Sequence, residues 1–437
     1  MRIAYLSVSD QLGGSEIALL EMIKGVRRAR PAWPIHLILP GRGPLLAQAE
    51  AAGADCTVLP LPQALSSVGE SAAEDSRWSL ATRAALGARL ATVAISLPAY
   101  VIRLRRLLRT IAPDIVHSNG LKAHITAAWV VSSVRRPRAD SRLPTNDSRL
   151  PTNDSRLTTD SRLTTDDSRL IWHIHDYIGP RRVTRTLMRA HQRRVSTVIA
   201  NSASVADDLK RVLSASARIE VLHNAVDLET FAPQGPVQDL DASAGVMPPP
   251  SNAVRVGLVA TFARWKGHEV FLRAIAALPP DVPVRGYIVG GALYDTSGSQ
   301  YAIDELKTLA HTLGVSDRVA FTGFLPPAAA MRALDIVVHA STRPEPFGLV
   351  IAEAMACGRA VITSASGGAA ELVTPGVDAL THTPGDAADL SRIIARLVSD
   401  ADLRARLGTC ARVAACRRFD PDRLARDLVN VYEQTIH

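Results

Sequence analysis

Short apolar runs alternate with longer stretches of helical periodicity along most of the chain. The run IAYLSV near the N-terminus is followed by a helical pattern after Gly14 and then by the run IHLILP. Runs of roughly four to eight apolar residues indicate buried strands, whereas apolar residues at every third or fourth position indicate amphipathic helices. Because strands that alternate with helices form parallel sheets, the pattern predicts an α/β protein.

The alternation stops once and then begins again, which predicts two domains. Residues 232–253 are rich in Pro, Gly, Ser and Ala and lack periodicity, as is typical of a linker. A chain of 437 residues also exceeds what one hydrophobic core usually serves. We therefore expect doubly wound, Rossmann-like parallel sheets over residues 1–231 and 254–415. The last stretch, 416–437, has a helical period and can cross back to the first domain.

One segment of the first domain breaks the pattern. The tripeptide Ser-Arg-Leu recurs five times between Ser141 and Ser168, with a period of about seven residues. A coiled coil needs two apolar positions in each heptad, and this repeat supplies one, with prolines added. We therefore expect residues 138–169 to be a disordered surface insertion, at a place where a short loop would suffice.

The composition excludes several classes of protein. Hydrophobic residues make up 47% and charged residues 21% of the chain, which is typical of a globular domain. Aromatic residues make up only 4%, which argues against a stacking platform for single-stranded nucleic acid, so we expect no nucleic-acid partner. The net charge of +8 favours anionic partners without distinguishing among them. No apolar run reaches the roughly 18 residues that a membrane-spanning helix needs.

The cysteines and the first residues indicate the compartment. The four cysteines have no Cys-x-x-Cys spacing and are too few for a disulfide framework, which fits a reducing cytoplasm. The first ten residues are typical of a strand and lack the apolar core of a signal peptide. We therefore expect a cytoplasmic protein.

A basic stretch lies between Arg77 and Arg109. It contains seven arginines and no acidic residue, mixed with Leu, Val and Ile. Such a surface can lie on an anionic membrane, which would give peripheral contact at the inner face through residues 77–110. The same pattern also fits a pair of surface helices whose arginines face water.

The clearest chemical motif is PEPFGLVIAE, where a predicted strand leads into a helix. Ligands of parallel sheets bind at the carboxyl ends of the strands, and the N–H groups of Phe347, Gly348 and Leu349 would form a helix N-terminus suited to a diphosphate. The carboxylates of Glu345 and Glu353 would then accept hydrogen bonds from hydroxyl groups at the two ends of a sugar nucleotide. Alternatively, Glu345 is solvated and Glu353 is an acid that favours the helix dipole.

The first half contains two further candidates. The strand–Gly13–Gly14–helix turn offers backbone N–H groups to an anion, although it is not a G-x-G-x-x-G fingerprint. His173 and His175 alternate on a strand next to Asp176, so a metal site is conceivable. No further ligand cluster supports that site. A strand end with one core-facing and one cleft-facing side chain explains the pair, and we expect no metal.

These segments resemble glycosyltransferase family 4, a group of retaining enzymes with the two-domain GT-B fold. The resemblance covers essentially the whole chain except the Ser-Arg-Leu repeat and residues 232–253. It rests on PEPFGLVIAEAMACG, on the turn at Gly14, on WHIHDY around His175 and on ARWKGHE around Lys266.

The resemblance implies individual roles. Lys266 would neutralise the donor diphosphate as a point charge, and His175 would line the site near the sugar. The family usually has an arginine five residues before that lysine, where this chain has Thr261, and Arg264 is the candidate replacement. Glu371 follows a matching Gly-Gly pair and belongs either to the site or to the cap of its own helix.

We therefore expect a hexosyltransferase that moves a sugar from a nucleoside diphosphate sugar to a sugar, lipid-linked or small-molecule acceptor, in bacterial polysaccharide, glycolipid or glycoconjugate synthesis. The resemblance implies retention of configuration and no cofactor. The alternatives are a nucleotide-sugar epimerase on the same scaffold and a non-catalytic sugar-nucleotide-binding protein. The expected catalytic residues are His175, Lys266 and Glu345. The expected donor-binding residues are Gly14, Arg264, Lys266, Glu345, Phe347, Gly348, Leu349 and Glu353.

Overall fold

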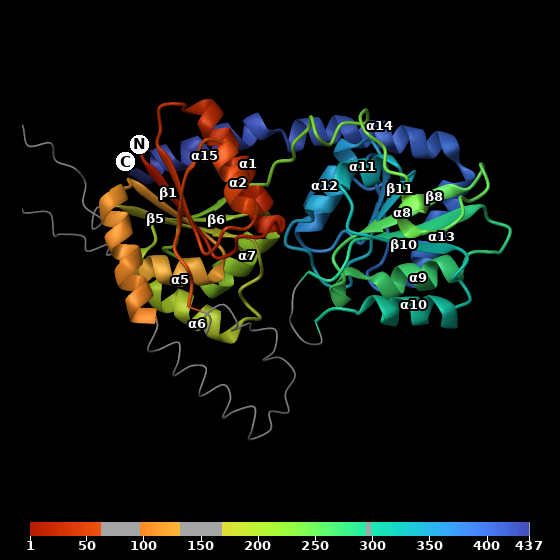
Figure 1. Ribbon diagram of the computed structural model, residues 1–437, viewed down its shortest axis with the longest axis horizontal. Coiled ribbons are helices and arrows are strands. Elements are labelled where there is room, and N and C mark those ends of the chain that lie inside the picture. Colours follow the sequence, from red (N-terminus) through yellow and green to blue (C-terminus); the bar gives the residue numbers. More distant parts are fainter. Residues whose placement is uncertain (63–96, 132–167, 294–298, 437) are drawn as a thin grey trace, which may run out of the picture.

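Two parallel sheets form two separate α/β units. The computed structural model describes residues 1–62, 97–131, 168–293 and 299–436. The first sheet has the strand order β3-β2-β1-β4-β5-β6-β7, and the second has the order β10-β9-β8-β11-β12-β13. Helices cover both sheets, and the two units lie side by side (Figure 1). The predicted α/β architecture with two doubly wound sheets is confirmed.

The first sheet is parallel throughout, as the alternation predicts. Its strands are β1 (Ile3–Ser7), β2 (Ile35–Leu39), β3 (Asp55–Val58), β4 (Ile115–Asn119), β5 (Arg169–Ile174), β6 (Thr197–Ala200) and β7 (Ile219–Val221). Its helices are α1 (Gly14–Ala29), α2 (Pro44–Ala51), a helix over 97–111, α5 (Leu121–Val130), α6 (Arg182–His191) and α7 (Ala203–Val212). Strands β1 and β4 are buried along their whole length, because helices cover both faces of the sheet.

The second sheet follows the same plan. Its strands are β8 (Val254–Val259), β9 (Val284–Val289), β10 (Val319–Gly323), β11 (Ile336–His339), β12 (Ala360–Thr363) and β13 (Leu380–Thr381). Its helices are α9 (His268–Ala276), α10 (Ile303–Thr312), α11 (Pro327–Arg332), α12 (Leu349–Ala356), α13 (Ala387–Ser399) and α14 (Ala401–Arg418).

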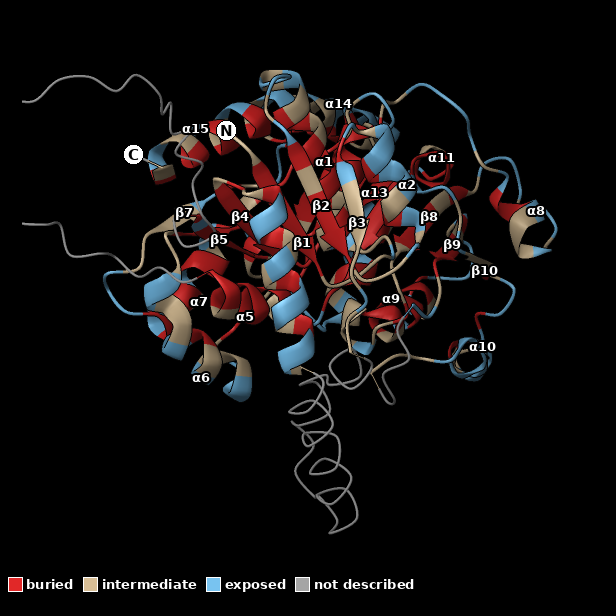
Figure 2. Cartoon of the chain, turned by 60° about the vertical axis from the view of Figure 1, so that its left-hand side comes forward, coloured by how far each residue is buried: buried red, intermediate tan, exposed pale blue. Residues whose placement is uncertain are grey.

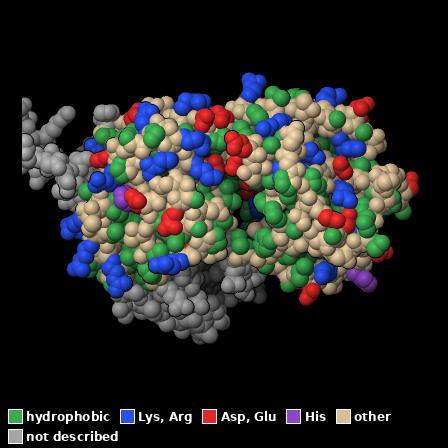
Figure 3. Space-filling model, turned by 45° about the horizontal axis from the view of Figure 1, so that its top comes forward, with side chains coloured by type: hydrophobic (Ala, Val, Ile, Leu, Met, Phe, Trp, Pro, Cys, Tyr) green, Lys and Arg blue, Asp and Glu red, His purple; other side chains and the backbone are tan. Residues whose placement is uncertain are grey.

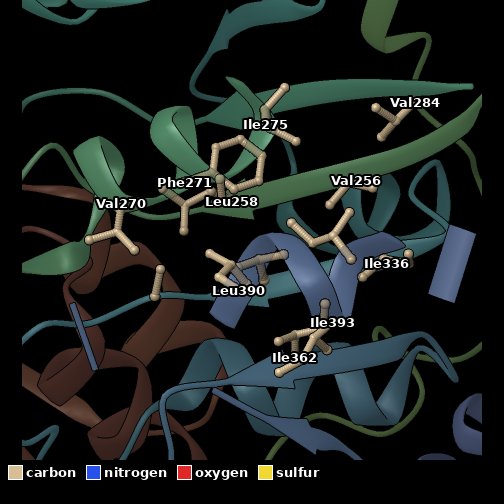
Figure 4. Close-up of a cluster of buried hydrophobic side chains, with 14 of the residues drawn as sticks. Val256, Leu258, Val270, Phe271, Ile275, Val284, Ile336, Ile362, Leu390 and Ile393 are labelled. Carbon is tan, nitrogen blue, oxygen red and sulfur yellow. The ribbon is translucent and has the colours of Figure 1, made fainter. Parts of the chain in front are cut away.

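Apolar side chains between each sheet and its helices form the cores. In the second domain Leu258 and Ile362 from the sheet pack with Phe271 of α9 and Leu390 of α13 (Figure 4). Full burial of one such side chain contributes roughly 1.5–3 kcal/mol to folding. The central strands are buried, whereas the edge strands β3 and β7 and the outer faces of the helices are partly or fully exposed (Figure 2).

The strand order reverses beside the first strand of each sheet, and this reversal positions the site. Strand β1 lies between β2 and β4, and β8 lies between β9 and β11. Connections on the two sides of such a strand leave in opposite directions, which opens a crevice at the carboxyl edge. The turn at Gly14 follows β1, Lys266 follows β8 and Glu345 follows β11.

Residues 232–253, expected to be a linker, include the short helix α8 (Leu240–Ala244). Leu240 is fully buried, and the buried carboxylate of Asp241 accepts a hydrogen bond from the Tyr287 hydroxyl at 2.7 Å and pairs with Arg255 at 2.7 Å. The middle of this stretch is therefore packed onto the second domain. Periodicity could not reveal it, because five helical residues are too few to show a period.

The chain ends on the first domain. Helix α15 (Pro421–Ile436) lies against α1, after α14 has run along the second domain (Figure 1). The buried Tyr432 hydroxyl donates to the Tyr5 hydroxyl at 2.9 Å and lies 2.9 Å from His117 Nδ1. A Cβ on Gly25 would lie 3.1 Å from the Cβ of Ala425, so a glycine in α1 allows the two helices to approach closely.

The Ser-Arg-Leu repeat lies almost wholly outside the described residues, as does the first part of the basic stretch, 77–96. The expected end of the insertion, residue 169, is wrong. Ser168 Oγ donates to the Pro113 carbonyl at 2.6 Å, and Arg169 is the first residue of β5. The last Ser-Arg-Leu copy therefore begins the strand, since its leucine occupies a buried position of β5.

We expect Tyr432→Phe to lower the free energy of unfolding by about 1–3 kcal/mol, because it leaves His117 and Tyr5 buried with one partner fewer. Denaturant unfolding followed by circular dichroism measures the change. Tyr301→Phe is the matched control, since its hydroxyl is half-buried at the surface and its contact with Glu269 is long, at 3.5 Å. Equal stability of Tyr432→Phe and the wild-type protein would contradict this role.

Candidate functional site

The carboxyl edges of the two sheets face each other across the boundary between the domains. A Cβ on Gly14, at the start of α1, would lie 3.6 Å from Leu349 Cδ1, at the start of α12. The Tyr177 hydroxyl donates to the backbone carbonyl of Glu345 at 3.2 Å across the same boundary. The surface is hollowed along this boundary, with charged side chains of both signs on its rim (Figure 3).

The carboxylate of Glu345 is the centre of a buried polar group. It is 7% exposed and accepts hydrogen bonds from Lys266 Nζ at 2.9 and 3.0 Å, from Ser341 Oγ at 2.9 Å and from His339 Nε2 at 3.1 Å. Burial alone would raise the pKa of Glu345, but the Lys266 ammonium and the His339 hydrogen bond outweigh it and hold that pKa well below its usual range. The alternative of a solvated Glu345 is therefore wrong.

Lys266 reaches this carboxylate through a close approach of two backbones. It ends a short 3₁₀ helix, Arg264–Lys266, and Gly267 follows with φ of 80°. A Cβ on Gly267 would lie 1.9 Å from the Ala340 carbonyl oxygen, so only glycine allows this contact with the end of β11. The Lys266 ammonium also lies 4.1 Å from the centre of the Trp265 ring.

Arg264 makes different contacts from Lys266. Its guanidinium donates to the Glu305 carboxylate of α10 at 2.9 and 3.1 Å and lies 4.3 Å from the centre of the Tyr301 ring. Arg264 and Tyr301 line a cavity of about 310 Å³ together with Glu269 and Arg273 of α9. Arg264 therefore forms an ion pair with Glu305 of α10, whereas Lys266 forms one with Glu345.

The three predicted backbone donors lie at the start of α12. Gly348 precedes the helix with φ of 100°, in the left-handed region that favours glycine. Among the described residues, no acceptor takes the N–H groups of Phe347, Gly348 and Leu349, so they are free to bind an anion at the positive end of the helix dipole. Phe347 is buried, with its ring packed between His223 and Phe419.

Glu353 lies one turn into α12 and is 9% exposed. Its carboxylate has no hydrogen-bond partner among the described residues, and burial raises the pKa of Glu353 to about 7. Glu353 lies beyond the first turn of α12, which contains no acidic residue. The alternative in which Glu353 stabilises the helix through its dipole is therefore not supported. A hydroxyl group of a bound ligand would satisfy this carboxylate.

His175 supplies the first-domain side of the site. It directly follows β5, and its Nε2 lies 2.7 Å from Asn119 Oδ1. The centre of its ring lies 4.1 Å from that of His173, with the two rings tilted by 35°. Burial lowers the pKa of His175 to about 4, which keeps the imidazole neutral. Asp176, considered above as a metal ligand beside the two histidines, forms an ion pair with Arg181. No group of three metal-ligating side chains occurs in the part of the chain that the structure describes.

Glu371 connects the two domains. Its carboxylate accepts hydrogen bonds from the N–H groups of Ala203 and Ser204, both at 2.8 Å, and lies 3.0 Å from His223 Nε2. Glu371 thus caps α7 of the first domain, not its own helix as one sequence alternative had it. Periodicity could not identify this cap, because 168 residues separate Glu371 from Ala203.

Asn119, His339 and Ser341 were missed by the sequence analysis. All three occur within or directly after strands β4 and β11, where they are part of ordinary apolar runs. The only available signal was that each is a polar residue at the carboxyl end of a central strand, the edge where ligands of such sheets bind.

The described part of the basic stretch is the helix over 97–111. Arg103, Arg106 and Arg109 are exposed on it, and Ile102 is 52% exposed. Within residues 1–62, 97–131, 168–293 and 299–436, no helix is both long enough and apolar enough to cross a bilayer.

Family models match both halves of the chain. Residues 246–413 match the model described as "Glycosyl transferases group 1", and residues 159–230 match the model described as "Glycosyltransferase Family 4". A "D-inositol 3-phosphate glycosyltransferase" from Xylanimonas cellulosilytica is 35% identical over 246 residues, 54% of this chain and 56% of the relative. The chain spans about half the length of the curated relatives it matches.

Solved structures match the whole chain. The crystal structure of Anabaena Alr3699/HepE in complex with UDP-glucose has a TM-score of 0.73 and 25% identity, covering 99% of this chain and all of that one. Sucrose-phosphate synthase from Thermosynechococcus elongatus has a TM-score of 0.71 at 20% identity, over 99% of this chain and 98% of that one, and so supports the fold alone. The predicted GT-B fold is confirmed.

We expect Glu371→Ala to favour a more open arrangement of the domains, because two charge-assisted hydrogen bonds to a helix N-terminus contribute roughly 1–2 kcal/mol. Small-angle X-ray scattering measures the radius of gyration, which should increase. Glu433→Ala is the control, since Glu433 pairs with Arg30 within the first domain. An unchanged radius in Glu371→Ala would show that this cap does not hold the domains together.

Proposed function

Because this chain belongs to family 4 of the GT-B glycosyltransferases, we propose that it is a retaining hexosyltransferase that uses a nucleoside diphosphate sugar. One observation carries the proposal. The free N–H groups and the unpartnered Glu353 carboxylate lie on the first part of α12, and the Lys266 ammonium, from the loop after β8, contacts Glu345 just before this helix. Together they offer cationic and N–H donors to a diphosphate and an acceptor to a hydroxyl group.

The donor would bind with its diphosphate at the start of α12. The N–H groups of Gly348 and Leu349 would donate to phosphate oxygens, and Lys266 would add a positive charge beside them. Glu353 would accept a hydrogen bond from a hydroxyl of the bound nucleotide sugar. The structurally similar Anabaena Alr3699/HepE was solved in complex with UDP-glucose, so UDP-sugars are the first donors to test.

Negative charge develops on the departing diphosphate during transfer. The bond from the anomeric carbon to the phosphate oxygen breaks, a bond to the acceptor oxygen forms, and the acceptor proton ends on the diphosphate. Lys266 and the dipole of α12 would stabilise this charge in place, and preorganised groups of that kind are usually the largest contribution to such a reaction. We propose that no metal ion is required.

Glu345 would support this charge arrangement and would not act as a nucleophile. Its oxygens already accept hydrogen bonds from Lys266, Ser341 and His339, and its low pKa makes it a weak nucleophile. His175, being neutral, would hydrogen-bond to a sugar without protonating it. Retention would then proceed without a covalent intermediate on these residues.

The acceptor would approach from the first domain. The curated relatives, which this chain matches over about half of their length, are D-inositol 3-phosphate glycosyltransferases. Inositol 3-phosphate is therefore one acceptor to test beside lipid-linked and free sugars. We also propose peripheral contact with the inner face of the membrane. Its support is the exposed Ile102 among Arg103, Arg106 and Arg109, a pattern suited to an anionic surface.

We expect Lys266→Ala to lower turnover roughly a hundredfold or more, the scale for loss of one key electrostatic contact. Release of nucleoside diphosphate from a panel of donors, with and without acceptors and with and without a chelator, measures the reaction. Lys210→Ala is the matched control and should stay within about threefold of wild type, because its exposed ammonium pairs with Asp207 on α7, away from the site.

Wild-type turnover in Lys266→Ala would contradict the assignment. A changed sugar without release of nucleoside diphosphate would favour the epimerase alternative. Donor binding with no reaction in any acceptor panel would favour the non-catalytic alternative.

Membrane contact is tested by sedimentation with anionic and neutral vesicles. Each arginine near an anionic surface contributes about 1 kcal/mol, so we expect R106E/R109E to lower binding to anionic vesicles at least roughly tenfold. R406E/R417E, which reverses two exposed charges on α14 of the second domain, is the control. Equal binding by both variants, or no preference for anionic vesicles, would exclude contact through this helix.

A further inference from the structure

One fully buried amide connects three elements at the edge of the first sheet. Asn119 is the last residue of β4. Its Nδ2 donates to the carbonyl oxygen of Ser15, in the first turn of α1, at 3.2 Å. Its Oδ1 lies 2.7 Å from Nε2 of His175, which directly follows β5. The same side chain therefore contacts His175 and the turn that begins at Gly14.

The hydrogen-bond chemistry determines which way the amide points. The Ser15 carbonyl can only accept a hydrogen bond, so the NH₂ end of Asn119 has to face it. The oxygen end then faces His175. Because an amide oxygen can only accept, Nε2 of His175 has to carry a proton to make the 2.7 Å contact.

One proton on Nε2 leaves Nδ1 without one. Burial lowers the pKa of His175 to about 4, so near neutral pH the ring carries no second proton. Among the described residues, nothing donates a hydrogen bond to Nδ1 of His175. Both ring nitrogens of the neighbouring His173 are fully buried without a partner, whereas Nδ1 of His175 is not fully buried. Nδ1 is therefore an open hydrogen-bond acceptor on the first-domain side of the site.

We propose that Asn119 is a positioning residue that holds His175 as the Nε2–H tautomer and thereby presents Nδ1 as an acceptor to a substrate hydroxyl group. A hydroxyl can donate to this nitrogen, whereas a phosphate or carboxylate oxygen cannot. The substrate part of the inference rests on the proposed function, but the tautomer does not.

The surrounding geometry explains why an amide suits this position. Aspartate would keep an oxygen toward His175 but would place a second oxygen against the Ser15 carbonyl. Leucine would leave both partners without a hydrogen bond. The residue after Asn119 has to be glycine, because Gly120 has φ of 97° and a Cβ there would lie 2.9 Å from Val8 Cγ2.

The tautomer is measured by ¹⁵N NMR of the full-length protein labelled at histidine. The His175 signals are assigned by their loss in His175→Gln. In the wild-type protein we expect only the Nε2–H form. Asn119→Ala should populate the Nδ1–H form as well, as in a free imidazole, whereas Asn119→Asp should keep the Nε2–H form because an oxygen still faces Nε2.

Turnover supplies a second readout. We expect Asn119→Ala to lower kcat roughly tenfold with a smaller change in the donor KM, the scale of one positioned hydrogen bond. Asn119→Asp should recover part of that loss. In a His175→Ala background, Asn119→Ala should lower kcat little further, because its effect passes through the missing imidazole.

Ser118→Ala is the matched control. Ser118 precedes Asn119 on β4, is equally buried and hydrogen-bonds to His124 Nδ1 and to the Ile171 carbonyl on the opposite face of the sheet. It should leave both the His175 tautomer and the donor KM unchanged.

The inference is overturned by an Nδ1–H form in the wild-type protein, by a single unchanged tautomer in Asn119→Ala, or by an equal loss of kcat in the His175→Ala background. These outcomes are separable from a failure of the proposed function. If no donor is turned over, the tautomer measurement still decides the role of Asn119.

Discussion

The charge on Glu345 is the constraint on which the rest of the site depends. A buried carboxylate is costly unless it is paired and hydrogen-bonded, and Glu345 is 7% exposed. Three side chains form hydrogen bonds with this carboxylate. Lys266 lies in the loop after β8, His339 is the last residue of β11, and Ser341 lies shortly after that strand. Satisfying one carboxylate therefore fixes two neighbouring loops of the second sheet relative to each other, directly before the turn into α12.

The backbone of the same residue reaches the first domain. The Glu345 carbonyl accepts from the Gly368 N–H at 2.7 Å and from the Tyr177 hydroxyl at 3.2 Å. Glu371, a few residues further along, caps α7 of the first domain. The two halves of the site are thus joined by polar contacts close to the ligand-binding edge, and α15 joins them again far from it. Polar contacts of this kind can break and re-form, so we expect the domains to open and close around a ligand.

Much of the fold could be predicted because it follows from local pattern. Alternating apolar runs predicted the parallel sheets, and the strand-to-helix turns at Gly14 and Gly348 followed from glycine beside a helix start. Local pattern did not show two contacts of the structure. Arg264, predicted to bind the donor, also pairs with Glu305, which is 41 residues away. Residues 232–253, interpreted as a linker, include a five-residue helix that is too short to show a period.

The sequence by itself determined the alternation of strands and helices, the strand-to-helix turns at Gly14 and Gly348 and the need for glycine there. These properties depend on periodicity and on φ, which act within a few residues. Only the tertiary structure decided which charges pair. Lys266 and Glu345 are 79 residues apart, and Glu371 and Ala203 are 168 apart. Because the energy of a charge depends on its burial and its partners in space, no local pattern contains that information.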